Sequence, residues 1–297
     1  MSKSIVIGAN GYIGRNLAFY IRSLNEECFC FDVQETSFDD LNVYKKLDIT
    51  NWDSVSKLNV DVDYIFLFAG LTGTSQGFDN YHQYIDINEK GLLNILTRMK
   101  ETSSRAKIVF PSTRLVYKGL SGVSLKEEAE KETKTIYALN KLACEYILEM
   151  YRNAFGINYT IFRICVPYGS MIEGATSYGT IGFFLQNAAN GKDINLYGDG
   201  ALRRTFTNVR DICRKIKMAN QDDNSNHKIY NIGGENFSLL EVATKIALKY
   251  SVNIKFADWP PLTYKIESGD TVFDSSHLDE LLQDNQYRGF DKWLEEK

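Results

Sequence analysis

The 297-residue sequence predicts an α/β fold: a doubly wound parallel sheet with a smaller C-terminal α+β lobe. Two observations predict it. The expected strands are short, continuous apolar runs, which is typical of strands that helices cover on both faces. These runs also alternate with helical patterns over the first two-thirds of the chain, as the βαβ connections of a parallel sheet require.

The first domain is expected over residues 1–165. Its first strand is the β-branched run Ser4–Ile7. Further apolar runs predict strands at Cys28–Val33, Tyr44–Asp48, Asp63–Ala69, Ala106–Pro111 and Asn158–Ile164. Two longer helical patterns cover Asn80–Lys100 and Thr135–Phe155.

The character of the chain changes near residue 165, where Gly, Asn and Asp become denser and the elements shorten. We expect a smaller substrate-binding lobe over residues 166–297, with a chain path interleaved with the first domain. Short elements are predicted at Thr180–Asn190, Ile194–Leu196, Val209–Ala219, Ile229–Ile232 and Leu239–Tyr250.

Composition argues against several classes of partner. The net charge of −4 does not favour nucleic acid or an anionic membrane surface. No apolar run approaches the roughly 20 residues that span a bilayer. The five cysteines form no CxxC pair and the three histidines are scattered, so we expect no metal site and a reduced, cytoplasmic setting.

Three glycines spaced three apart follow the first strand: Gly8, Gly11 and Gly14. Strand, glycine turn and helix form a pyrophosphate cradle, because backbone N–H groups approach the phosphates and the helix N-terminus is partly positive. A turn that needs glycine only for packing is the alternative. The pattern predicts the dinucleotide site of a Rossmann fold.

Two carboxylates at strand ends bear on the choice of nucleotide. Asp32 lies 18 residues after Gly14, close to the roughly 20 at which a carboxylate meets the adenosine ribose. A carboxylate there repels a 2′-phosphate, which favours NAD over NADP. Asp48 could accept from the adenine amino group or serve as a helix N-cap.

Tyr137 and Lys141 lie four apart on a predicted helix and so share one face. A cation beside a phenol, like an oxidised nicotinamide nearby, lowers the phenol pKa. Such a tyrosine can take a proton from a sugar hydroxyl while hydride leaves the same carbon. Thr113, at the end of the fifth strand, would hold the same oxygen.

Several motifs in order resemble those of the extended short-chain dehydrogenase/reductase family, in its nucleotide-sugar epimerase/dehydratase branch and especially UDP-hexose 4-epimerases. The resemblance covers residues 4–235. The matching segments are Gly8–Gly14 (GxxGxxG), Phe68–Leu71, Asn88–Asn94, Thr113–Tyr117 ([ST]xxVY), Tyr137–Lys141 (YxxxK), Arg163–Gly169 and Gly198–Arg204 (GDGxxxR).

The resemblance implies roles for single residues. Thr113, Tyr137 and Lys141 would be catalytic. Substrate would be bound by Thr113, Tyr137, Thr72, Tyr197 and Arg204, the last at the diphosphate. NAD would be bound by Gly8, Asn10, Gly11, Tyr12, Ile13, Gly14, Asp32, Asp48, Ile49, Phe68, Ala69, Gly70, Asn88, Tyr137, Lys141 and Val166.

Three departures from the family pattern limit what carries over. Val166 stands where the family usually has an asparagine that contacts the substrate phosphate. Thr72 stands where many 4-epimerases have a lysine. Arg114 and Leu115 follow Thr113, where 4,6-dehydratases place two acids, so no acid is positioned to eliminate water.

The leading hypothesis is an NAD-dependent 4-epimerase of a nucleotide-diphosphate hexose that acts through a transient 4-keto sugar. The alternatives are an NADH-dependent reductase of a nucleotide-linked 4-keto-6-deoxy sugar and a non-catalytic NAD-sensing protein. The resemblance also implies a homodimer through a four-helix bundle, made by the helices predicted near residues 80–100 and 135–155.

Overall fold

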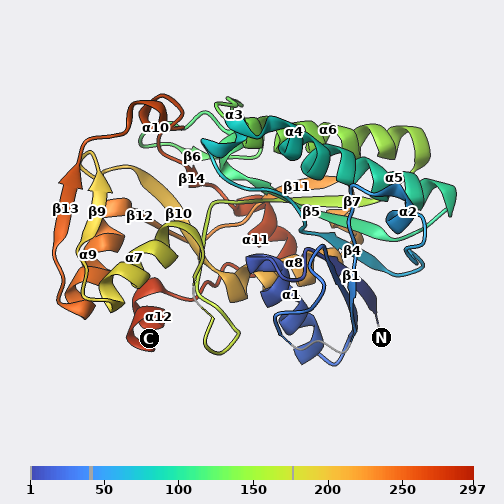
Figure 1. Cartoon of the computed structure of the whole chain (residues 1–297), viewed down its shortest axis with the longest axis horizontal. Coiled ribbons are helices and arrows are strands. Elements are labelled where there is room, and N and C mark those ends of the chain that lie inside the picture. Colours follow the sequence, from blue (N-terminus) through green and yellow to red (C-terminus); the bar gives the residue numbers. More distant parts are fainter. Residues whose placement is uncertain (1, 40–42, 176) are drawn as a thin grey trace.

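A seven-stranded parallel sheet forms the larger layer of the molecule (Figure 1). The computed structural model describes residues 2–39, 43–175 and 177–297. The strands lie in the order β11-β7-β5-β4-β1-β2-β3. Their bounds are β1 Lys3–Ile7, β2 Glu27–Asp32, β3 Tyr44–Lys46, β4 Tyr64–Leu67, β5 Lys107–Thr113, β7 Tyr159–Ile164 and β11 Lys228–Asn231.

Helices cover both faces of this sheet, as Figure 1 shows. On one face α1 (Tyr12–Ser23), α8 (Val209–Asn220) and α11 (Ser276–Leu282) bury an apolar cluster that includes Leu17, Ile216 and Leu278. On the other face α2 (Trp52–Val55), α5 (Gly91–Glu101) and α6 (Ile136–Phe155) bury a second cluster. The predicted doubly wound α/β fold is confirmed.

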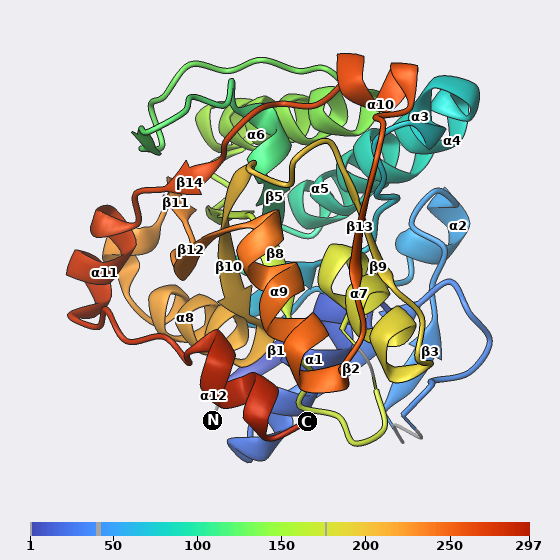
Figure 2. The same ribbon diagram turned by 90° about the vertical axis from the view of Figure 1, so that its left-hand side faces the viewer.

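The smaller lobe lies at one end of the main sheet and faces the viewer in Figure 2. Its strands pair as β12-β10-β8 and as β13-β9. Its core includes Tyr168, Phe206 and Trp293. The elements are β8 Val166–Tyr168, α7 Gly179–Ala189, β9 Ile194–Tyr197, β10 Arg203–Asn208, β12 Glu235–Ser238, α9 Leu239–Tyr250, β13 Ile254–Ala257 and α12 Phe290–Glu295.

The chain crosses between the two layers more than once. Strand β11 lies between β10 and β12 in sequence but pairs with β7, and α8 packs on α1. Three elements that come after residue 165, α8, β11 and α11, therefore belong to the sheet layer. The domain boundary at residue 165 stays a prediction. The remaining short elements are β6 Ser124–Leu125, η3 Asp223–Ser225, α10 Pro261–Lys265 and β14 Val272–Phe273, of which β14 pairs with β6.

The two long helices predicted on one face of the sheet differ in outcome. Helix α6 is as predicted: the Thr135 side chain caps its first turn and Gly156, at φ 71°, ends it. The segment predicted as helical over Asn80–Lys100 is also helical, but a π-helical turn, η1 (Ile85–Lys90), lies within it. Short helices α3 (Gln76–Asp79) and α4 (Tyr81–Tyr84) precede that turn. None of the helices within the described ranges is long and apolar enough to cross a membrane.

Candidate active site

The glycine turn after β1 is packed so tightly that two of its positions exclude a side chain. Gly8 has φ +93°, and a Cβ there would collide with the backbone of Phe68 and Ala69. A Cβ at Gly14 would collide with the Gly8 carbonyl. The turn therefore lies directly against the end of β4.

The N-terminus of α1 opens at this turn. Gly11 is the N-cap and makes no side-chain cap, and no acidic residue lies in the first turn. The first N–H groups of a helix have no partner within the helix and favour an anion. The turn and α1 thus form a cradle that fits a pyrophosphate.

A cavity of about 320 Å³ lies in front of this turn, at the carboxyl ends of the strands. It gathers many of the residues predicted to bind the cofactor. The predicted residues that line it are Gly8, Asn10, Gly11, Asp32, Asp48, Ile49, Phe68, Ala69 and Gly70. Ligands of doubly wound sheets bind at this edge, beside the reversal of strand order.

The two predicted carboxylates line the cavity in different ways. Asp32 accepts from the Asn10 N–H at 2.9 Å and from the Val33 N–H at 2.8 Å. Each oxygen of Asp32 keeps acceptor capacity for a ribose hydroxyl. Asp48 accepts from the Thr50 N–H at 2.9 Å and hydroxyl at 2.7 Å, so it holds a local turn, and Asn51 is the N-cap of α2.

Two predicted cofactor residues make hydrogen bonds within the protein through their side-chain amides. The Asn10 amide donates to the Thr36 carbonyl and accepts from the Phe38 N–H, both at 3.0 Å. Asn88 accepts from the Leu71 N–H at 2.8 Å and donates to its carbonyl at 3.1 Å. Each amide positions a loop of the cavity, and direct contact of these two residues with the cofactor stays a prediction.

Three further predicted cofactor residues lie outside the lining of the cavity. Tyr12 donates its hydroxyl to the Gly169 carbonyl at 2.6 Å and so links α1 to the smaller lobe. Ile13 packs on the apolar cluster under α1. Val166 begins β8, beside Phe206, and packs on core residues of the smaller lobe. Their contact with the cofactor stays a prediction.

Thr113, Tyr137 and Lys141 come together at the carboxyl end of β5. Thr113 is the last residue of β5, while Tyr137 and Lys141 lie in the first turns of α6. The Thr113 side chain lies close enough to the Tyr137 phenol to lower its pKa. The Lys141 ammonium lies 6.0 Å from the centre of the Tyr137 ring and 4.3 Å from that of Phe110.

Burial dominates the proton affinities of this group. It raises the pKa of Tyr137 to about 12, and the Thr113 side chain offsets only part of that effect. It lowers the pKa of Lys141 to about 8. The predicted lowering of the Tyr137 pKa is thus wrong for the protein alone, because desolvation of the phenolate outweighs the charges around it.

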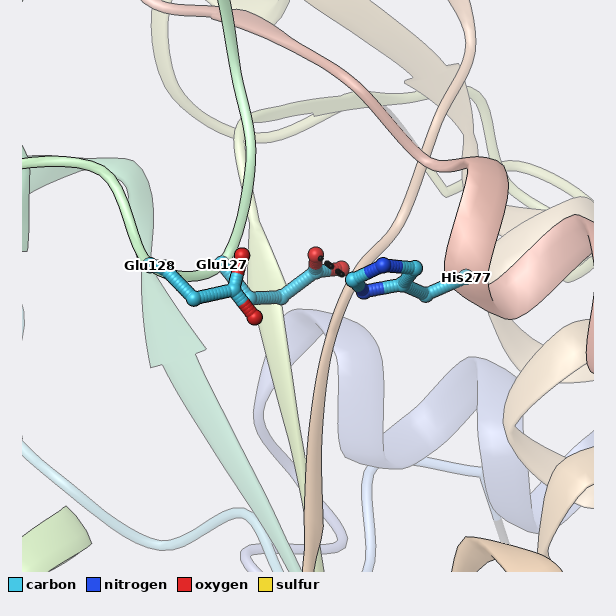
Figure 3. Close-up of side chains that lie close together, drawn as sticks. All are labelled: Glu127, Glu128 and His277. Carbon is cyan, nitrogen blue, oxygen red and sulfur yellow. Dashed lines mark ion pairs between the residues drawn. The ribbon is translucent and has the colours of Figure 1, made fainter.

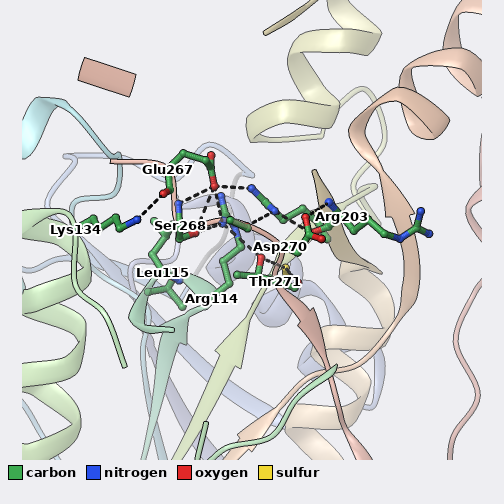
Figure 4. Close-up of polar contacts among 12 residues, drawn as sticks. Arg114, Leu115, Lys134, Arg203, Glu267, Ser268, Asp270 and Thr271 are labelled. Atoms are coloured by element: carbon green, nitrogen blue, oxygen red, sulfur yellow. Dashed lines mark hydrogen bonds and ion pairs between the residues drawn. The ribbon is translucent and has the colours of Figure 1, made fainter. Parts of the chain in front are cut away.

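Arg204 is turned into the protein instead of toward a substrate. It is 2% exposed and donates to Glu267 Oε1 at 2.6 Å, the Gly269 carbonyl at 2.6 Å and the Arg203 carbonyl at 2.8 Å. Figure 4 shows this network beside Arg114 and Ser268. The predicted contact with a diphosphate stays a prediction, and in this structure a buried ion pair takes up the guanidinium.

The other predicted substrate residues, Thr72 and Tyr197, are exposed on the surface. Thr72 is exposed, and its hydroxyl lies 3.0 Å from that of Tyr178 in the smaller lobe. Tyr197 ends β9, is 46% exposed and packs on Trp259 with ring centres 5.4 Å apart. No contact joins Tyr197 to the Thr113, Tyr137 and Lys141 group within the described chain, so its role stays a prediction.

One cluster of possible metal ligands lies away from this site. Glu127, Glu128 and His277 place ligand atoms within 4.8 Å of one another (Figure 3). Glu127 already accepts from the Asn231 N–H at 2.7 Å and pairs with His277 at 2.9 Å. We assign no metal to this cluster, because these contacts account for the buried carboxylate as an ion pair that joins α11 to the 126–130 loop.

The model of the NAD dependent epimerase/dehydratase family matches residues 4–233. The chain belongs to this family. The CDP-paratose 2-epimerase of Salmonella typhi is 25% identical over 295 residues, with 87% of each chain covered. The UDP-glucose 4-epimerase of Lacticaseibacillus casei is 25% identical over 266 residues, which cover 81% of this chain and 80% of the relative.

The structure of the UDP-glucose 4-epimerase of Thermus thermophilus in complex with NAD has the same fold. It superposes with a TM-score of 0.85 over 98% of this chain and 96% of its own, at 20% identity. As a member of the family, the protein is an NAD-dependent enzyme.

The residues present fit NAD. The glycine cradle at the start of α1 would hold the pyrophosphate, and Asp32 would hold the adenosine ribose. Lys141 is 5% exposed and donates to no group within the described chain, so it can bind the nicotinamide ribose. The residues that would bind NAD are thus in place, and the ammonium of Lys141 has no hydrogen bond among the described residues that would compete with the cofactor.

The structure adds residues to this family site that the sequence did not indicate. Gln34 and Phe38 line the cavity, and the Tyr178 hydroxyl lies 3.0 Å from that of Thr72. Only one signal could have pointed to Phe38: an asparagine in the glycine turn can hold a neighbouring loop through its amide. The others come from loops whose sequence matches no motif.

Proposed function

We propose that the protein is an NAD-dependent 4-epimerase of a nucleotide-diphosphate hexose that acts through a transient 4-keto intermediate. The observation that carries the proposal is the convergence of Thr113, Tyr137 and Lys141 beside the NAD cradle. The names of its relatives support a nucleotide-sugar substrate, since they include epimerases of UDP-glucose and UDP-glucuronate.

The three residues divide the proton transfer among them. Bound NAD supplies the hydride acceptor. Tyr137, as phenolate, takes the proton of the C4 hydroxyl, and Thr113 holds the same oxygen in line with the phenol. Lys141 stabilises the phenolate through its charge. When hydride returns to the other face of the 4-keto sugar, Tyr137 gives the proton back.

Residues that follow Thr113 favour epimerisation over dehydration. In η2 (Arg114–Val116) a cation and an apolar side chain occupy the first two positions. Glu145, an acid near Lys141, is bound to Arg163 at 2.6 Å and to Ser112. Neither arrangement offers a carboxylic acid that could protonate a leaving hydroxyl.

The proposal is tested with NAD-loaded protein and a panel of UDP-, dTDP-, CDP- and GDP-hexoses. We expect NMR to show conversion at C4 without added cofactor. Consumption of NADH with 4-keto sugars alone would select the reductase instead. Absence of both reactions across the panel would contradict an active-site role for the three residues.

Tyr137→Phe removes the proton acceptor but keeps the ring. We expect turnover to fall at least about a thousandfold, a loss on the scale of acid–base catalysis, with NAD still bound. Initial rates and NAD affinity are the measurements. Tyr146→Phe, on the exposed face of the same helix, is the matched control and should keep full activity.

We also propose that the enzyme is a homodimer through a four-helix bundle. Leu139, Tyr146 and Met150 of α6 are all more than half exposed and share one helix face. Tyr81 and Ile85, on the neighbouring helical segment, are 43% and 42% exposed. Sedimentation analysis should give a dimer, and Tyr146→Asp should shift it toward the monomer.

A further inference from the structure

The substrate side of the cleft lacks an available cation at the predicted position. Arg204 is taken up by Glu267 and two carbonyls. Arg203 pairs with Glu241 at 3.1 Å and donates to the Asn236 carbonyl at 2.8 Å. Val166 offers no polar group. A nucleotide sugar carries at least two negative charges, so another residue has to meet them.

Arg114 lies beside the reacting centre. It follows Thr113 directly, and its charge is felt by both the Tyr137 phenol and the Cys165 thiol. Its side chain is 17% exposed, in contrast to the enclosed Arg204. Arg114 is therefore the guanidinium placed between the catalytic group and the smaller lobe.

Most of the hydrogen-bonding capacity of Arg114 is unused within the described chain. One nitrogen, Nη1, donates to the Ser268 hydroxyl at 3.0 Å and approaches the Thr271 hydroxyl at 3.5 Å (Figure 4). Both partners are neutral. A guanidinium has five N–H donors in a planar fork, so several remain for a ligand.

Arg114 shares its carboxylate neighbour with a second guanidinium. Its carboxylate neighbour, Glu267 Oε1, lies 3.9 Å away, which is too far for a hydrogen bond. The same oxygen binds Arg204 at 2.6 Å and the Ser268 N–H at 2.8 Å. Two guanidiniums thus share one carboxylate, and that of Arg114 lies farther from it than that of Arg204.

We propose that Arg114 binds an oxyanion of the substrate and takes the part that Arg204 cannot play. This inference rests on the proposed function and deepens it. Two groups of a nucleotide sugar supply such an anion: the diphosphate, or a carboxylate at C6 of a hexuronate. A guanidinium fork matches either one with two parallel hydrogen bonds.

The test compares Arg114→Ala with the wild-type enzyme, both loaded with NAD. The probes are UDP, dTDP, CDP and GDP, then the glucose and glucuronate conjugates of the nucleotide that binds, all measured by calorimetry. We expect the variant to bind the anion about ten- to a hundredfold more weakly, as for loss of a charged hydrogen bond. Arg203→Ala is the matched control and should bind as the wild type does.

The pattern of loss identifies the anion. Equal weakening of the free nucleoside diphosphate and of both conjugates assigns Arg114 to the diphosphate. Weakening of the glucuronate conjugate alone assigns it to the C6 carboxylate. Wild-type affinity for every probe in the variant would overturn the inference and leave the proposed function standing.

Two outcomes separate the inference from other causes of failure. If wild-type protein binds none of the probes, the nucleotide-sugar function is contradicted and the inference falls with it. NAD affinity reports whether the variant is folded. If Arg114→Ala loses NAD affinity as well, Arg114→Gln replaces it, because glutamine keeps a donor for Ser268. The same binding measurements on Arg114→Gln then decide whether Arg114 binds the anion.

Discussion

The contacts that position residues on the cofactor side and on the substrate side of the site differ in how far apart their partners lie in the sequence. On the cofactor side Gly14 lies against the Gly8 carbonyl and Asp32 accepts from the Asn10 N–H, both within the first βαβ unit. On the substrate side Arg204 binds Glu267, 63 residues further along the chain. A short motif can describe the first kind of contact completely. The second kind depends on which side chains a segment distant in sequence places nearby. A motif residue such as Arg204 can therefore bind a protein side chain instead of the ligand that the motif predicts.

Two buried cations show the same contrast. Arg204 has a carboxylate within hydrogen-bond distance, and its charge is met inside the protein. Lys141 is equally enclosed but has no carboxylate or carbonyl partner in the part of the chain that the structure describes. An unpaired buried cation costs stability, and such a cost is typical of sites that bind or react. This contrast supports the proposed role of Lys141 in the site and a structural role for Arg204.

The largest effect is expected at the glycine turn. Gly8→Ala forces a side chain onto the backbone of Phe68 and Ala69 at a positive φ. We expect a loss of about 3–5 kcal/mol in the free energy of unfolding, from overpacking and backbone strain together. NAD affinity should fall at least about a hundredfold, because the displaced turn no longer aims the N–H groups of α1 at the pyrophosphate.

Gly122→Ala is the matched control for this change. Gly122 also has positive φ, at +74°, but open space surrounds it. Urea unfolding should show a loss of only about 1 kcal/mol, the cost of the left-handed backbone alone. Equal losses for the two variants would mean that close packing at Gly8 is not what defines the turn.

Sequence alone was sufficient where one residue type satisfies one local requirement. The glycine spacing, Asp32 at a strand end and the Tyr137/Lys141 spacing on α6 all follow from backbone geometry, and the structure places them as expected. The π-turn at Ile85–Lys90 could not be predicted, because its residues have ordinary helical propensities. The Arg204 pairing could not be predicted either, since it depends on where the chain brings Glu267.

The next effect in size tests whether Arg204 is structural. Glu267→Ala leaves a buried guanidinium without its carboxylate, so we expect a loss of about 2–3 kcal/mol in the free energy of unfolding. Arg204→Met in the same chain should recover much of that loss, because no unpaired charge then remains. A double-mutant cycle by urea unfolding measures the coupling.

The exposed pair Lys118 and Glu130 gives the control for that cycle. Their side chains are 43% and 64% exposed, so Glu130→Ala should change stability by less than about 0.5 kcal/mol. The result that would break the comparison is a Glu267→Ala variant of unchanged stability that binds nucleoside diphosphates more tightly. Arg204 would then belong to the substrate after all, with Glu267 as its competitor.

The last prediction concerns Lys141 and tests the opposite side of the comparison through the dependence of stability on pH. Burial lowers the pKa of Lys141 to about 8, below its ordinary value. Between these two values the unfolded chain binds more protons than the folded one, so stability rises with pH in that window. Below this pH window Lys141 is charged in both states, so the free energy of unfolding is reduced by the full cost of burying the charge.

Lys141→Met should therefore stabilise the NAD-free protein by about 2–3 kcal/mol at pH 7, because it removes the buried charge. The gain should shrink as the pH rises from about 8 toward the ordinary lysine pKa, where the wild-type side chain is neutral in both states. Urea unfolding at several pH values measures it, with the exposed Lys57→Met as the control. A gain that stays constant across this range would show that packing, and not an unpaired charge, distinguishes Lys141 from Arg204.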